Sequence, residues 1–238
     1  AVCSVVALLV GAIAAVLIVL TRWQAVHLLP AEWFYRILGV HGMSMLIFFI
    51  IFFEMAVLIF ASTALINARI AAPKLGWAAF ALMLGGATLV EVIMWAGKAD
   101  VLFTSYVPLK ADPLYYLGII LFAVGALLVC GIFFANLVVA RREQTYTGSL
   151  PLVVYGAVTA AIIAVITLLH GAAIYIPTFL WSLGLMHVDP QVYRMIWWGL
   201  GHSSQQINVA AMVAIWYMRG ALTIGPVVLN EKISRSSV

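Results

Sequence analysis

Six long apolar stretches separated by short polar connections dominate the pattern of hydrophobic and polar positions along the chain. Each is close to or above the length of about 20 residues that an α-helix needs to cross the hydrocarbon core of a membrane. The runs are continuous and lack the alternation of a membrane β-barrel, so we expect helices and no strands. The predicted spanning helices cover approximately residues 2–21, 37–66, 75–97, 113–140, 150–176 and 191–218.

The composition agrees with a membrane location. Hydrophobic residues make up 66% of the chain, charged residues only 8%, and the mean hydropathy is +1.17. A soluble domain has about 25% charged residues, so this chain cannot cover a water-facing surface. We predict an all-α, polytopic transmembrane bundle that forms a single domain over residues 1–238. Cys3 and Cys130 lie in apolar runs and form no metal motif, and nothing in the sequence indicates nucleic-acid binding.

The basic residues predict an orientation. One side of the membrane would carry seven of them and the other side five, and the positive-inside rule places the richer side in the cytoplasm. That side includes the loops 67–74 and 141–149 and the C-terminal tail. The N-terminus is predicted to be cytoplasmic as well.

Several ionisable or amide side chains fall inside the apolar stretches. Such groups are costly at membrane depth and by default indicate cofactors, ion paths or proton relays. Glu54 and Glu91 are candidates for a proton path or for pairing with buried polar partners, and His170 is expected to be structural. The full set is His41, Glu54, Glu91, His170 and His202, with Gln205, Gln206 and Asn208 after the last histidine.

His41 and His202 have the most informative surroundings. Imidazole binds heme iron through one nitrogen while the other donates a hydrogen bond that fixes the ring, and Gly42 would let a flat macrocycle approach the backbone beside His41. His202 follows Trp197-Trp198-Gly199-Leu200-Gly201 and opens the polar run 203–208, which must face protein, cofactor or water. His202 and Gln206 share one helix face. A structural role for His41, and hydrogen bonds between helices for the polar run, remain alternatives.

With these motifs on the second and sixth helices, the chain resembles the N-terminal half of subunit I of the heme–copper oxidases. His-Gly near the start of helix 2 is that family's low-spin heme motif, and Arg, paired Trp and Gly-His on helix 6 is its first copper-B motif. Tyr106–Gly118 and Val188-Asp189-Pro190 resemble the B-type members before helices 4 and 6. The resemblance therefore implies that His41 ligates a low-spin heme and that His202 ligates copper-B beside a high-spin heme.

The resemblance also implies partners. It predicts a cytochrome-containing or CuA-type subunit II, cytochrome c or quinol as electron donor, surrounding lipid, and a location in the inner (plasma) membrane. The family subunit has about twelve helices or more, with a His-His pair on helix 7 and further heme ligands on helix 10. None of these lies in residues 1–238. We therefore expect a chain truncated before helix 7, or a complementary chain that completes the site.

One departure from the family pattern bears on the substrate. Oxygen-reducing members carry Gly-His-Pro-x-x-Tyr, whereas this chain has Ser203 in place of the proline and Gln206 in place of the tyrosine. A glutamine amide can donate and accept hydrogen bonds but is not easily oxidised. Reduction of nitric oxide to nitrous oxide cleaves no O–O bond and can proceed without a redox-active tyrosine.

The sequence thus favours a nitric-oxide-reductase-like subunit in which Gln206 hydrogen-bonds substrate or water. Three alternatives remain: a proton-pumping cytochrome c or quinol oxidase with its tyrosine elsewhere, a transporter or channel, and a non-catalytic subunit.

Overall fold

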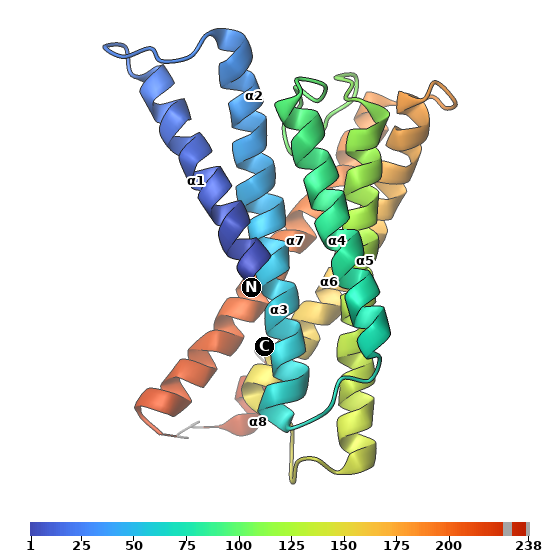
Figure 1. Cartoon of the computed structure of the whole chain (residues 1–238). Helices are drawn as coiled ribbons and strands as arrows, with labels where there is room; N and C mark the ends of the chain where they lie inside the picture. The colour runs from blue at the N-terminus through green and yellow to red at the C-terminus, as the bar shows by residue number, and fades with distance from the viewer. Residues whose placement is uncertain (226–229, 237–238) are drawn as a thin grey trace.

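The computed structural model describes residues 1–225 and 230–236, and every regular element in this part of the chain is helical. The chain order is α1 (Val2–Arg22), α2 (Ala31–Gly42), the π-helix η1 (Met43–Phe49), α3 (Ile50–Thr63), the 3-10 helix η2 (Ala64–Ile66), α4 (Pro73–Trp95), α5 (Pro113–Glu143), α6 (Leu152–Ser182), α7 (Pro190–Thr223) and α8 (Glu231–Ser236). Elements α2 to η2 follow one another without a break as one continuous helix (Figure 1). The predicted all-α fold is confirmed. Residues 226–229 and 237–238 of the predicted single domain lie outside the described residues.

Helices α2 and α6 each extend six residues further than predicted. Helix α2 begins at Ala31 rather than near residue 37, because Pro30 supplies the extended residue before the helix and Arg36 pairs with Glu32 at 2.9 Å. Helix α6 continues past Pro177 to Ser182 instead of ending near residue 176. Membrane helices tolerate an internal proline when neighbouring helices and hydroxyl side chains satisfy the backbone groups that it frees.

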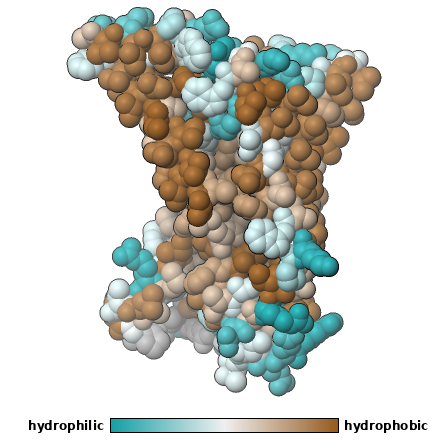
Figure 2. All heavy atoms as spheres, in the orientation of Figure 1, coloured by the Kyte–Doolittle hydropathy of each residue, from teal (hydrophilic) through white to brown (hydrophobic). Residues whose placement is uncertain are grey.

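The surface of the molecule matches a membrane protein. Apolar side chains form a broad band between hydrophilic ends (Figure 2). Within the described residues, five helices are long and apolar enough to cross a membrane: Val2–Arg22, Ala31–Ile66, Pro73–Trp95, Pro113–Glu143 and Leu152–Ser182. The sixth predicted span is a helix of 34 residues, α7, but it does not belong to this apolar set. Its polar run 203–208 lowers its hydropathy, and we expect this face to meet protein rather than lipid.

Helices α4 and α5 pack closely against each other (Figure 1). A Cβ atom at Gly86 would overlap the carbonyl oxygen of Gly118 and lie 2.6 Å from the amide nitrogen of Phe122. A Cβ atom at Gly118 would lie 2.8 Å from the carbonyl oxygen of Gly86. The two backbones therefore touch where both helices lack a side chain, which is the usual way that membrane helices gain close packing.

Helix α1 packs on the upper half of the continuous helix, as Figure 1 is drawn. The Ser4 hydroxyl donates to the carbonyl oxygen of Phe49 at 2.9 Å, so α1 begins beside the middle of that helix. Helix α7 packs on α6 and then diverges from the bundle at its lower end (Figure 1). The predicted cytoplasmic position of the N-terminus stays a prediction.

The connection between α4 and α5, residues 96–112, folds over the upper end of the bundle, and we call it the cap loop. Tyrosine hydroxyls from three helices hold it in place. Tyr193 Oη donates to the carbonyl oxygen of Thr104 at 2.9 Å, and Tyr175 Oη donates to that of Phe103 at 3.4 Å. The buried Tyr115 and Tyr116 bond to Ser105 Oγ at 3.0 Å and to the Ala111 amide nitrogen at 3.2 Å.

At the lower end, the fully buried Asn136 of α5 plays a similar part. Its side-chain oxygen accepts a hydrogen bond from the Ala71 amide at 2.8 Å, and its amide nitrogen donates to Ser62 Oγ at 3.0 Å. Asn136 therefore joins the loop before α4 to the end of α3.

Replacing Gly86 with alanine tests the α4–α5 contact. We expect Gly86→Ala to lower the free energy of unfolding by about 1–3 kcal/mol, because a methyl group would force two backbones apart. Gly85→Ala is the matched control, since a Cβ atom at Gly85 meets nothing within 4 Å. Unfolding of the purified protein in detergent would measure both, and equal stability of the two variants would contradict the proposed backbone contact.

Candidate functional site

His41 lies in the last turn of α2, immediately before η1, and is partly buried. Its Nδ1 atom is 2.9 Å from the carbonyl oxygen of Gly11 on α1. Because a carbonyl oxygen only accepts hydrogen bonds, Nδ1 carries the hydrogen and Nε2 keeps its lone pair. This is the arrangement that orients a metal-binding histidine and fixes its tautomer.

Gly11 permits the approach of α1 on which this hydrogen bond depends. A Cβ atom at Gly11 would lie 2.6 Å from Met45 Sδ on the π-helix. The glycine thus brings its own carbonyl oxygen to the His41 ring. The sequence analysis did not single out Gly11; its only signal was a glycine within an apolar helix, which does not identify a partner.

Gly42 faces the cap loop, with the Phe103 ring on the side of its missing side chain. The expected approach of a flat macrocycle to the backbone at Gly42 stays a prediction. A Cβ atom on Gly42 would lie 3.3 Å from Phe103 Cδ1. Gly39, one turn earlier, likewise faces the cap loop, with the Val101 carbonyl oxygen 2.8 Å from the position of its missing Cβ atom. These glycines seat the cap loop on α2.

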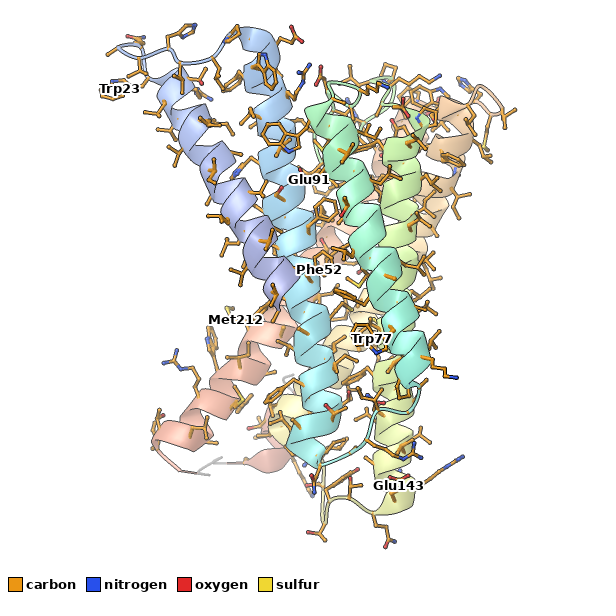
Figure 3. All side chains as sticks on the ribbon, viewed as in Figure 1. Trp23, Phe52, Trp77, Glu91, Glu143 and Met212 are labelled. Carbon is orange, nitrogen blue, oxygen red and sulfur yellow. The ribbon has the colours of Figure 1, made fainter. Side chains whose placement is uncertain are left out.

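Glu91 joins α4 to the π-helix that follows His41. The Ser44 hydroxyl donates to Glu91 Oε1 at 2.6 Å, and Glu91 lies between α4 and the continuous helix (Figure 3). Its other oxygen, Oε2, is buried and has no hydrogen-bond partner among the described residues. Single-turn π-helical segments recur at functional sites, and here the segment turns Ser44 toward the carboxylate.

His202 lies on the face of α7 that the described residues leave exposed. Its ring stacks on Trp198 with centroids 4.7 Å apart and an interplanar angle of 29°. Its Nδ1 atom is 3.3 Å from Gln205 Oε1, which orients the ring within its own helix. His202 and His41 are therefore held separately, each by its own set of contacts.

The paired tryptophans before His202 have different surroundings. Trp197 is buried and contacts Phe103 and Tyr106 of the cap loop, whereas Trp198 is exposed and supports His202. The centroids of Trp197 and Trp198 are 5.1 Å apart. A continuous series of ring contacts therefore runs from Phe103, which covers Gly42, to His202.

The remaining polar residues of α7 do not converge with His41. Gln205, Gln206 and Asn208 are exposed on the described part of the chain. Within that part, no three His, Cys, Asp or Glu side chains are placed to hold a metal ion. His202 would thus supply one ligand of a larger set.

Glu54 occupies a separate position on α3. It lines cavities between α3, α6 and α7, and its Oε1 atom is buried with no hydrogen-bond partner among the described residues. His170 belongs to neither cavity. It bonds through Nδ1 to the Ile166 carbonyl oxygen of its own helix at 2.9 Å and packs against Gly199, where a Cβ atom would lie 2.5 Å from His170 Cδ2.

These features define a polytopic helical membrane protein with an oriented histidine on its second and on its sixth long helix. The family model described as cytochrome c and quinol oxidase polypeptide I matches residues 1–237. The chain belongs to this family, the catalytic-subunit family of the heme–copper oxidases.

The relatives agree with this assignment. Cytochrome c oxidase subunit 1 of Thermus thermophilus is 30% identical over 183 residues, which cover 74% of this chain and 32% of the relative. The fold is similar to that of a heme–copper terminal oxidase dimer solved by cryo-electron microscopy. That match has a TM-score of 0.69 and 24% identity, and it covers 91% of this chain and 40% of the other. The chain spans about a third of the length of the curated relative.

The heme–copper oxidase family consists of oxidoreductases of multi-subunit membrane complexes that hold hemes and copper. The two histidines differ in how completely their surroundings prepare them to bind such groups. His41, with a bare Nε2 and an oriented Nδ1–H, is suited to hold heme iron. His202 is suited to copper as one nitrogen ligand, and further ligands would have to cover the exposed face of α7.

Changing Gly11 tests the orientation of His41. We expect Gly11→Val to displace α1 from Met45 and to remove the hydrogen bond to His41 Nδ1. Loss of such an orienting partner typically lowers metal affinity about 10–100-fold. The measurement is the low-spin heme content and spectrum of the purified complex. Ala12→Val, at an exposed neighbouring position, is the control, and an unchanged heme spectrum in Gly11→Val would refute the proposed role.

Proposed function

We propose that this chain forms part of the catalytic subunit of a respiratory heme–copper reductase that converts nitric oxide to nitrous oxide. The observation that carries the proposal is Gln206, one helical turn after His202 on the same exposed face of α7. A tyrosine at this position could supply an electron and a proton for O–O cleavage, whereas an amide supplies only hydrogen bonds. Joining two nitric oxide molecules requires two electrons and two protons but no O–O cleavage.

When bound, the two hemes and copper would carry the electrons and provide an open coordination position for the diatomic substrate. His41 would hold the low-spin heme through Nε2, with its tautomer fixed by the Gly11 carbonyl oxygen. His202 would contribute one nitrogen ligand to copper-B, and its ring is kept in place by Trp198. Gln206 would hydrogen-bond substrate or water beside it.

Glu54 and Glu91 are the proposed proton-path groups of the chain. Both carboxylates have one buried oxygen without a hydrogen-bond partner among the described residues. Glu91 is tied to the π-helix after His41, whereas Glu54 lines the cavities next to α6 and α7. The two groups would therefore serve different parts of the protein.

The exposure of His202, Gln205 and Gln206 supports a partner at this face. We propose that the second half of subunit I, or a complementary chain, covers α7 and brings the remaining copper and heme ligands. A cytochrome-containing or CuA-type subunit II would deliver electrons from cytochrome c or quinol. The proposed location is the inner (plasma) membrane, with the N-terminus in the cytoplasm.

The second candidate function is reduction of oxygen to water with proton pumping. It is favoured by the relatives, which are a cytochrome c oxidase subunit and a heme–copper terminal oxidase. This function would need its redox-active tyrosine outside the described residues of α7. Gas turnover separates the two candidates.

The decisive measurement is turnover of the purified intact complex with an artificial electron donor, supplied with nitric oxide and with oxygen in separate experiments. We expect rapid production of nitrous oxide and little oxygen uptake. Gln206→Leu should slow nitrous oxide production about tenfold or more, which is the effect of losing about 1.4 kcal/mol of hydrogen bonding in the transition state. Gln191→Leu, in the first turn of α7, is the control. Fast oxygen uptake with negligible nitrous oxide would instead establish the oxidase.

Alanine variants of the two histidines test their separate roles. His41→Ala should remove the low-spin heme spectrum while copper is retained, because the two histidines share no contact. His202→Ala should lower the copper content while the low-spin spectrum stays unchanged. Optical spectra and metal analysis of the intact complex measure both quantities. A normal low-spin spectrum in His41→Ala would refute the assignment of the heme ligand.

A further inference from the structure

His170 of α6 occupies the place of the side chain that Gly199 of α7 lacks. A Cβ atom on Gly199 would lie 2.5 Å from Cδ2 and 3.0 Å from Nε2 of the His170 ring. The next residues along the two helices also meet, because a Cβ atom on Gly171 would lie 2.9 Å from Leu200 Cδ1. The imidazole ring of His170 therefore rests directly on the backbone of α7 at position 199.

Position 199 is a neighbour of His202 on the surface of α7. Residues three apart on a helix lie next to each other, with about 5–6 Å between their Cβ atoms. Pairs at this spacing bind metal jointly in helical bundles, where a Glu-x-x-His motif supplies two ligands from one helix. His170 thus lies where the first residue of such a pair would lie, and His202 is the second.

The rings of His170 and His202 also lean toward the same depth. Helices α6 and α7 pack side by side and run in opposite directions, joined by the short connection 183–189 (Figure 1). Side chains on a helix tilt toward its N-terminus. His170 does so by bonding to the Ile166 carbonyl oxygen, four residues earlier. His202 does so by stacking on Trp198, also four residues earlier. Because the helices are antiparallel, these tilts bring the two rings closer together.

Both rings present the same nitrogen atom. The Ile166 carbonyl oxygen, 2.9 Å from His170 Nδ1, can only accept, so Nδ1 carries the hydrogen and Nε2 keeps its lone pair. His202 Nδ1 likewise lies 3.3 Å from an acceptor, Gln205 Oε1. A histidine whose Nδ1–H is held by a protein oxygen is oriented to bind metal through Nε2. Imidazole nitrogen is a ligand that suits copper.

We propose that His170 is a second nitrogen ligand, supplied by this chain, of the copper ion that His202 holds. The pair would bind copper beside Gly199, at the edge of the exposed face of α7, and the chain that covers this face would complete the coordination. This inference rests on the proposed function, which assigns copper to His202. Sequence analysis gave His170 a structural role, because its position opposite Gly199 depends on how α6 and α7 pack.

Copper affinity of the intact complex provides the first test. Copper is removed with a chelator, and Cu(I) is then titrated back in competition with a chelator of known affinity. His170→Ala should weaken copper binding about 100-fold or more, because losing a direct ligand costs more than losing an orienting partner. His187→Ala, in the exposed connection before α7, is the control, and the low-spin heme spectrum reports that each variant is folded. Unchanged copper affinity in His170→Ala overturns the proposal.

Gly199→Ala tests the same site without removing a histidine. The added methyl group would overlap the His170 ring and displace it, so copper affinity should fall about tenfold or more. Gly220→Ala is the matched control on the same helix, since a Cβ atom at Gly220 meets nothing within 4 Å. Equal copper affinity in the two variants would refute the position of His170 at the metal.

X-ray absorption at the copper edge distinguishes a ligand from a side chain that only supports His202. The copper shell of the unmodified complex should contain one more imidazole than that of His170→Ala loaded with copper at saturating concentration. A supporting side chain would change the affinity and leave the number of imidazoles unchanged, and that result would overturn the proposal.

The His202→Ala variant separates failure of this proposal from failure of the proposed function. If His202→Ala keeps its copper, the assignment of copper to His202 fails, and both proposals fail with it. If His202→Ala loses copper while His170→Ala binds it normally, the proposed function stands and His170 is structural.

Discussion

The scarcity of polar partners inside an apolar bundle is the constraint on which the rest of this structure depends. Away from water, each buried donor and acceptor must be satisfied within the protein. Thr21, Thr63, Thr167 and Thr178 therefore return their hydroxyls to carbonyl oxygens of their own helices. Where the partner lies on another element, the hydrogen bond holds two parts of the fold together. Asn136 does this at the lower end, and the tyrosines that bind the cap loop do it at the upper end. The carboxylates of Glu54 and Glu91 each keep one buried oxygen outside this pattern, and both are candidates for moving protons.

The fold was largely predictable because its main signal is local. Twenty apolar residues in a row indicate a membrane helix whatever surrounds them, and all six predicted segments are helical. The errors lie at the helix ends, where local chemistry competes with hydropathy. Pro30 and the Glu32–Arg36 pair start α2 early, and α6 continues through Pro177. The lower apolarity of α7 has a different cause, the polar run 203–208, in which Gln205, Gln206 and Asn208 are exposed on the described part of the chain.

Within the site, only the candidate ligands could be predicted from the sequence. His41 and His202 could be identified because histidine is rare in apolar helices, but their supporting contacts come from residues distant in sequence. Gly11 is 30 positions from His41 in the chain, and Ser44 is 47 positions from Glu91. Gly42 illustrates the same limit. A glycine in a helix indicates that another group packs closely against the backbone, but the sequence does not identify this group as Phe103. Pairings of this kind depend on helix packing, which hydropathy does not determine.

The cap loop has a consequence for how the protein is assembled. It connects α4 to α5, yet the hydroxyls of Tyr175 and Tyr193 that hold it belong to α6 and α7, which a ribosome synthesises later. When α5 has just entered the membrane, Tyr115 and Tyr116 are the two of these four tyrosines that are available to this loop. The loop gains its full set of tyrosine hydrogen bonds only after both later helices have been inserted. Complete fastening of the upper end is therefore a late event in biogenesis.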